Sequence, residues 1–243
     1  MKQGFDPMFR PVRSADVREI VYDEEHWSIF SGLRKRALEL MSGLEAAGLD
    51  PIVHGSVARG DVGRGSDVDV VLPYVVPSFK VELAVQGAGL ETVKREIVMA
   101  TPWQLPKAHL YVEEDRSVTF PLVKPKQNEL EFYYFGGAAN VEKLKKETRV
   151  PGVDKRLMLI EPSKVGHVES PVFGNEASAA KIVGVGLEIV RERVQVLTRR
   201  AEVGHTGIFV KRGLAPEESF EEVFKRLVEE NPDMRIGLKG RLP

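Results

Sequence analysis

Two aspartates one residue apart are the most chemically informative feature of this 243-residue sequence. Asp67 and Asp69 belong to the segment 67–72, whose other residues are valine and leucine, a composition typical of a β-strand. Strand side chains alternate between two faces, so both carboxylates lie on the same face, about 7 Å apart at their Cα atoms. Like charges this close repel each other unless a cation lies between them. The pair therefore predicts a site for a hard divalent ion, Mg²⁺ or Mn²⁺, whose coordination phosphate oxygens would complete.

A glycine–serine step precedes the aspartates, with ten residues in between. Glycine lets the backbone approach a ligand closely, and the amides that follow Ser56 would open a short helix whose N-terminus attracts anions. Arg59 would project from that first turn and could make charge-assisted contacts with a phosphate. We therefore expect Gly55, Ser56 and Arg59 to bind a nucleotide. The alternative is a tight turn before an edge strand whose aspartates are merely solvated.

The compound pattern of Gly55-Ser56, Arg59-Gly60 and the two aspartates in an apolar strand resembles the signature of the DNA polymerase beta superfamily of nucleotidyltransferases. The resemblance is strong over about twenty residues and looser over residues 1–140. It points to a stand-alone nucleotidyltransferase, distantly similar to CCA-adding enzymes. No P-loop pattern is present, and the aspartates lack the later ligands of a calcium loop.

The resemblance also implies a third carboxylate, set between apolar residues on a strand beside the aspartates. Glu131 fits that setting best, because Leu130 and Phe132 flank it, and Glu129 is the reserve candidate because it has the same parity. Both belong to the segment 129–135, which we predict to be a strand. Glu131 would then join Asp67 and Asp69 as a catalytic residue and metal ligand.

The resemblance implies that this chain transfers a nucleoside monophosphate from an NTP to an acceptor hydroxyl in a metal-dependent reaction that releases pyrophosphate. An RNA end is the favoured acceptor, while a protein hydroxyl and a small alcohol stay open. Two alternatives come from other classes: a catalytically quiescent, nucleotide-binding regulatory protein, and an RNA-binding protein that acts through its C-terminal half. The sequence gives no prediction of oligomeric state.

The helices and strands that must position these residues are predicted from the spacing of apolar residues and from the glycines and prolines that end each element. Apolar residues spaced by three and four predict a helix over 26–47, which Gly48 ends and whose basic run 34–36 we expect to face solvent. The pattern predicts further strands at 51–54, 92–101, 108–112 and 118–123, and further helices at 79–87, 140–148, 175–201 and 217–230.

The expected fold class is α/β (α+β), with two domains. Residues 1–140 would form a catalytic domain, a mixed sheet flanked by helices, and residues 141–243 a mostly helical domain. We expect residues 1–23 to form an arm on the surface and the tail 234–243 to be loosely held.

Composition limits the other possibilities. The chain is 42% hydrophobic and 29% charged, which is ordinary for a globular protein. Its lack of cysteine excludes disulfides, zinc–thiolate sites and cysteine nucleophiles. A net charge of −1 argues against broad coating of nucleic acid, although the part after residue 140 is slightly basic and the part before it slightly acidic. No apolar run is long enough for a membrane span, so we expect a cytoplasmic protein without a membrane partner.

Overall fold

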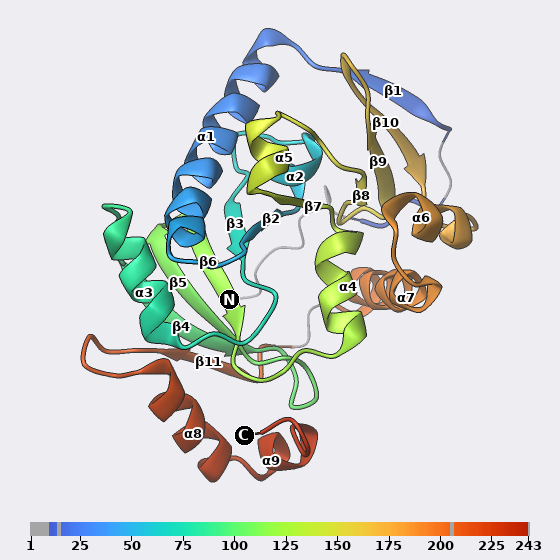
Figure 1. Cartoon of the computed structure of the whole chain (residues 1–243). Coiled ribbons are helices and arrows are strands. Elements are labelled where there is room, and N and C mark those ends of the chain that lie inside the picture. The colour runs from blue at the N-terminus through green and yellow to red at the C-terminus, as the bar shows by residue number, and fades with distance from the viewer. Residues whose placement is uncertain (1–9, 14–15, 205–206, 243) are drawn as a thin grey trace.

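The computed structural model describes residues 10–13, 16–204 and 207–242, which form two β-sheets with helices packed around them (Figure 1). The mixed α/β architecture confirms the predicted fold class. In sheet order, the larger sheet contains β11 (Val210–Gly213), β4 (Lys94–Met99), β5 (Lys107–Glu113), β6 (Arg116–Pro121), β3 (Val68–Val71), β2 (Ile52–His54) and β7 (Ala138–Asn140). The smaller sheet contains β1 (Arg18–Val21), β10 (Gly166–Pro171), β9 (Met158–Pro162) and β8 (Gly152–Val153).

The larger sheet is mixed because β3 and β6 run parallel, whereas its other described neighbours are antiparallel. Asp69 lies between two partners: His54 in β2 and Ser117 in β6. The register continues outward, since Ser117 pairs with Tyr111 in β5 and Tyr111 pairs with Lys94 in β4. The aspartate therefore lies near the centre of the sheet.

The two faces of this sheet differ in polarity. One face supplies the main hydrophobic core, where buried residues such as Val70 and Leu110 pack against α1 (Glu24–Ala46), α3 (Ser78–Gly87) and α8 (Phe220–Glu230). Figure 1 shows α1 and α3 together on one side of the sheet. Because strand side chains alternate, Asp69, Ser117 and Tyr111 point to the opposite face. The polar face is the one that carries the candidate site.

Helix α1 begins where Asp23 accepts a hydrogen bond from the backbone N–H of His26 at 2.8 Å. It buries the predicted apolar stripe, but the expectation that the run 34–36 faces solvent is wrong for Arg34. That guanidinium is buried, with only 8% of the residue exposed, and it lies 4.8 Å from the centre of the Phe30 ring. Lys35 is exposed as expected. Arg34 points into the protein because backbone carbonyl groups beneath α1 accept hydrogen bonds from its guanidinium.

The segment predicted as the strand 129–135 is instead helix α4 (Gln127–Phe135). Glu129 begins it by accepting a hydrogen bond from the backbone N–H of Lys126 at 2.7 Å, as an N-terminal helix cap does. The aromatic residues of α4 divide between two clusters, Tyr133 with Ile52 and Val71 of the larger sheet, and Phe135 with the core of the smaller sheet. A helix can direct neighbouring aromatic residues to two separate cores. This explains why an aromatic run that suggests a strand belongs to a helix.

The predicted long helix 175–201 is two helices, α6 (Glu176–Val183) and α7 (Leu187–Val203). Gly184 ends α6 in the left-handed conformation, with φ +78°. The backbone N–H of Gly186 then donates to Glu131 Oε2 at 3.1 Å, and a Cβ at this position would lie only 3.0 Å from that oxygen. The break therefore lets the start of α7 dock against α4.

The chain does not divide at residue 140 into a catalytic domain and a mostly helical one. Residues after 140 supply three strands of the smaller sheet, and β1 from the N-terminal part completes it. This strand falls within the predicted arm, of which residues 1–9 and 14–15 lie outside the described residues.

Later residues return to the larger sheet, where β11 pairs with β4 and α8 packs into the main core. Helix α9 (Pro232–Gly237) follows, and Met234 and Leu238 are completely buried. The described part of the tail is therefore docked rather than loosely held, since these side chains join the main core. Residues 141–145 form α5 (Val141–Lys145), the short charged helix that the sequence predicts.

Among the described residues, no helix combines the length and the apolar character that crossing a membrane would need.

Candidate active site

A glycine turn connects β2 to the motif. Gly55 has φ +82° and ψ −144°, a combination that a residue with a side chain rarely adopts, and its N–H donates to the carbonyl of Gly137 at 2.9 Å. The four-residue helix α2 (Ser56–Arg59) follows and ends at Gly60, which has φ +112°. Ser56 keeps its hydroxyl on the surface of the turn, 3.4 Å from the hydroxyl of Ser66. Gly55 and Ser56 thus occupy the strand–turn–helix predicted for them.

Buried Arg34 holds this turn from below. Its guanidinium donates to the carbonyl oxygens of Val57 at 2.8 Å, Ala58 at 3.0 Å and Thr148 at 3.0 Å. The first two carbonyls belong to α2, a helix too short to satisfy them internally. Arg34 therefore fixes α2 to α1 and to the loop after α5.

Both aspartates are exposed on the polar face. Asp69 is in β3 and Asp67 immediately precedes it, and the hydroxyl of Ser117 donates to Asp69 Oδ1 at the long distance of 3.4 Å. Partial desolvation and then the charge of Asp67 raise the pKa of Asp69 above its usual value, while Lys155 and Lys107 lower it by smaller amounts. An exposed carboxylate with a raised pKa beside a second carboxylate would gain from a cation.

The third carboxylate expected from the resemblance is not on a strand beside this pair. Glu131 lies on α4, where its carboxylate accepts from Gln127 Nε2 at 3.0 Å and from the N–H of Gly186. Glu129 forms an ion pair with Arg241, 2.5 Å apart. Within the described residues, no group of three or more histidine, aspartate or glutamate side chains is placed to hold a metal ion. Of the candidate metal ligands, the structure brings together only Asp67 and Asp69.

The position of Arg59 also differs from its predicted role. Its guanidinium is buried and donates to both carboxylate oxygens of Asp61, at 2.8 and 2.7 Å, and to the carbonyl of Gly136 at 2.5 Å. These contacts direct it into the protein rather than toward a ligand above the turn. Arg59 therefore positions the loop after α2, and its geometry does not agree with phosphate binding.

His54, which precedes the turn, is packed rather than available. Its Nδ1–H donates to the carbonyl of Tyr133 at 2.9 Å, and its ring lies 5.4 Å from that of Phe132. Desolvation by these neighbours lowers the pKa of His54 to about 4. The histidine is therefore neutral near pH 7 and connects β2 to α4.

The neighbouring strands extend the polar face away from the aspartates. The hydroxyl of Tyr111 donates to Glu96 of β4 at 2.8 Å. His109 Nδ1 lies 2.8 Å from the hydroxyl of Thr119, and desolvation lowers the pKa of His109 to about 4. A row of uncharged and charged polar groups thus leads from Ser117 toward the edge of the sheet.

Sequence reasoning did not identify Ser117, Tyr111 or Glu96. The signal that could have found them is the alternation of polar and apolar residues in β5, which places Lys107, His109 and Tyr111 on one face. The strand order was also needed, because only the register shows that this face continues from Asp69.

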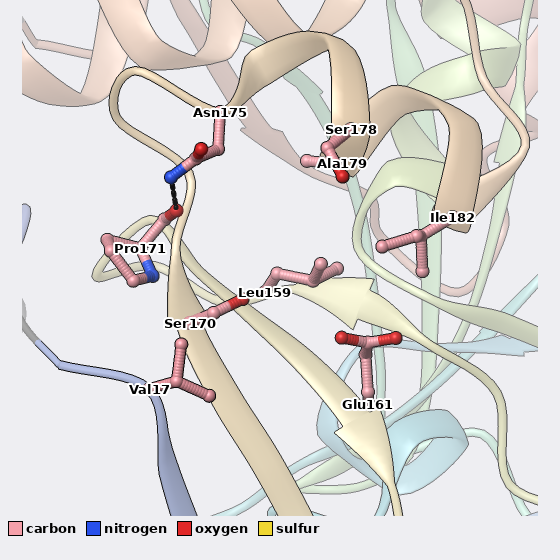
Figure 2. Close-up of a pocket in the computed structure, with 9 residues that line it drawn as sticks. All are labelled: Val17, Leu159, Glu161, Ser170, Pro171, Asn175, Ser178, Ala179 and Ile182. Atoms are coloured by element: carbon pink, nitrogen blue, oxygen red, sulfur yellow. Dashed lines mark hydrogen bonds between the residues drawn. The ribbon is translucent and has the colours of Figure 1, made fainter.

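A separate hollow of about 340 Å³ lies over the smaller sheet and α6 (Figure 2). Its walls include Leu159, Ser170 and Ile182, and Asn175 donates to the carbonyl of Pro171 at its rim, 3.2 Å away. Glu161 is the one charged side chain among those that line it. None of the lining residues comes from β2 or β3, so the hollow is not continuous with the aspartate pair.

Residues 34–101 match the family model described as a nucleotidyltransferase domain. The match begins within α1 and ends just after β4, so it contains Gly55, Ser56, Asp67 and Asp69. It covers less than a third of the chain. No curated protein and no solved structure matches the chain.

Proposed function

Because the chain carries a nucleotidyltransferase domain, we propose that it transfers a nucleoside monophosphate from an NTP to an acceptor hydroxyl and releases pyrophosphate. The observation that supports this proposal best is the exposed pair Asp67 and Asp69, at the start of β3 and near the turn at Gly55 and Ser56. All four residues lie within the matched segment.

The donor set fits a hard divalent cation. Asp67 and Asp69 offer carboxylate oxygens on one exposed face, and desolvation followed by the charge of Asp67 raises the pKa of Asp69. A divalent ion held by these residues would neutralise phosphate charge and lower the pKa of the attacking hydroxyl. With two protein carboxylates, further ligands would come from water and from the nucleotide phosphates.

The roles of the protein residues follow from their positions. The turn at Gly55 exposes backbone N–H groups and the Ser56 hydroxyl beside the aspartates, and these groups would bind terminal phosphates of the nucleotide. Ser117 borders the aspartates on the other side, where β6 begins the polar row. We propose an RNA end as the first acceptor to test and a protein hydroxyl as the second.

One observation favours a second candidate function. Neither Glu131 nor Glu129 extends the aspartate pair, and Ser117 is the residue directly across from Asp69 in β6. A site with two carboxylates suits nucleotide binding at least as well as turnover. The second candidate is therefore a nucleotide-binding protein that performs no transfer.

Both candidates can be tested in one experiment. The protein is incubated with each NTP labelled at the α-phosphate, with Mg²⁺ or Mn²⁺ and with RNA or protein acceptors, beside the variants Asp67→Asn and Asp69→Asn. The proposal predicts label in one acceptor, and we expect each variant to lose more than a hundredfold of the rate, since charge stabilisation dominates this chemistry. Transfer that survives in both variants would show that the site is wrong. Nucleotide binding that depends on the aspartates without transfer to any acceptor would favour the second candidate.

A further inference from the structure

The four arginines of α7 are unlike the other arginines of this protein. Each arginine from Arg13 to Arg241 outside α7 donates at least one hydrogen bond to the protein. Arg191, Arg193, Arg199 and Arg200 form no hydrogen bond and no ion pair with any residue that the structure describes. In a protein whose other guanidinium groups from Arg13 onward each donate at least one hydrogen bond, the four arginines of α7 are an exception.

Arg193 is the most unusual of the four because it is also partly withdrawn from solvent. Its Nε is buried without a partner, and its guanidinium lies 5.0 Å from the centre of the Phe132 ring on α4. Desolvation, and then the charge of Arg200 two helical turns away, lower the pKa of Arg193 to about 10. A cation in such surroundings destabilises the folded protein unless an anion joins it.

Lys107 is a second cation close to the same aromatic ring. Its ammonium group lies 5.2 Å from the centre of the Phe132 ring and 4.9 Å from that of Tyr133. Within the described chain it has no hydrogen bond and no carboxylate partner. Because both cations lie close to one ring centre, they can be no more than roughly 10 Å apart.

The cation cluster contains Lys107, Arg193 and Arg200, whose charge acts on Arg193, and Lys107 places it on the side of the larger sheet that carries the aspartates. Lys107 is on the same strand face as Tyr111, and its charge acts on both Asp69 and His54. Helix α7 packs against α4, and the two lie side by side in Figure 1. The cluster therefore borders the candidate site without belonging to the motif.

We propose that Lys107, Arg193 and Arg200 form a phosphate-binding site for a substrate of this enzyme, most simply for the part of the nucleotide triphosphate that extends beyond the turn at Gly55. Guanidinium and ammonium groups that lack protein partners keep their donors available for phosphate oxygens. The aromatic contacts hold two of the three cations in place before the ligand arrives. The inference rests on the proposed function, because the phosphate is that of a transfer substrate.

The test measures binding of inorganic tripolyphosphate, ATP and a single-stranded oligonucleotide to the intact chain. Lys107→Met and Arg193→Met remove one charge each and keep an unbranched side chain. Arg191→Met is the matched control on α7 and Lys225→Met the matched control for lysine, since both of these residues are exposed. We expect Lys107→Met and Arg193→Met to weaken tripolyphosphate and ATP binding about tenfold each, and the controls to leave it unchanged.

Thermal unfolding without ligand separates this role from a structural one. Removal of a partly buried, unpaired charge should leave the melting temperature of the free protein unchanged or raise it, whereas the stabilisation by tripolyphosphate should shrink. Weakened binding of the oligonucleotide alone would support the phosphate site and assign it to a polynucleotide acceptor. The inference is wrong if the wild type binds none of the three probes, or if both variants bind all three as tightly as Arg191→Met does.

The outcomes also separate this inference from the proposed function. A wild-type protein that binds tripolyphosphate through these residues but transfers no label would contradict the proposed function and leave the phosphate site standing. If transfer requires Asp69 but Lys107→Met and Arg193→Met leave phosphate binding unchanged, the proposed function is supported and the phosphate site is contradicted. Should Arg193→Met fail to fold, Arg193→Lys, which keeps the charge, and Lys107→Met still decide the question.

Discussion

Replacing Arg34 by methionine tests whether a buried arginine holds the motif turn in place. The wild-type guanidinium donates three hydrogen bonds, to the carbonyls of Val57, Ala58 and Thr148. Methionine keeps the helix propensity and most of the stem, so α1 should persist. The change therefore removes the donors and little else.

The expected cost follows from two opposing terms. Three hydrogen bonds from a charged donor contribute roughly 5–8 kcal/mol before the desolvation of the cation is counted. Burial opposes this, since desolvation lowers the pKa of Arg34 to about 10, which corresponds to about 3 kcal/mol against the charged form. Ala58 also keeps a bond from the N–H of Val150 at 3.2 Å. We therefore expect Arg34→Met to lower the free energy of unfolding by about 2–4 kcal/mol.

The assay is urea unfolding, with Lys35→Met as the control because Lys35 is the exposed neighbour on the same helix. The control should change the free energy of unfolding by less than about 0.5 kcal/mol. A value for Arg34→Met within about 0.5 kcal/mol of the control would refute the reasoning, because it would mean that the carbonyls find water or that the arginine contributes nothing net. The variant should also bind tripolyphosphate less tightly, since α2 would lose its support.

Three further predictions concern other parts of the molecule. Because the pKa of His54 is about 4 in the folded protein and 6.5 in the unfolded chain, the unfolded state takes up more protons below pH 6.5, and stability should fall from there toward pH 4; His54→Gln should flatten this slope in urea titrations. Leu238→Ala should cost about 2–4 kcal/mol in the same assay because Leu238 is fully buried, whereas Ile236→Ala, at a residue 63% exposed, should cost little; equal effects would mean that α9 is not docked. Asp69→Asn should raise the melting temperature of the metal-free protein, because it removes the repulsion from Asp67, and a lower melting temperature would contradict a binding role for the pair.

Local patterns predicted the elements around the motif correctly. The apolar spacing in α1, the glycine at 55 and the alternation in β3 are each determined by neighbours within a few residues, so the strand–turn–helix and the aspartate pair follow from the sequence. These features depend on backbone geometry more than on what packs against them.

The errors arose where the partner of a segment decides its structure. Segment 129–135 begins with acids that alternate with apolar residues, as in a strand, yet Tyr133 and Phe135 belong to two separate cores, which they reach from different sides of a helix. Arg34 and Arg59 look like surface cations, but carbonyl groups and Asp61 draw both inside. Charged residues were assigned by their chemistry alone, and the burial that decides their role depends on distant chain segments.

The exchange of strands between the two sheets has a consequence for how the protein can be divided. Strand β1 completes the smaller sheet, whereas β11, from the other end of the chain, completes the larger one. A fragment that stops at residue 140 would lack β11 and the helices α8 and α9 that pack into the main core, and a fragment that starts there would lack β1, one of the two partners of β10. Neither half should express as a soluble folded product, and protease should find no accessible linker between them. We expect the chain to unfold in one cooperative transition, so substitutions rather than truncations are the suitable way to separate its activities.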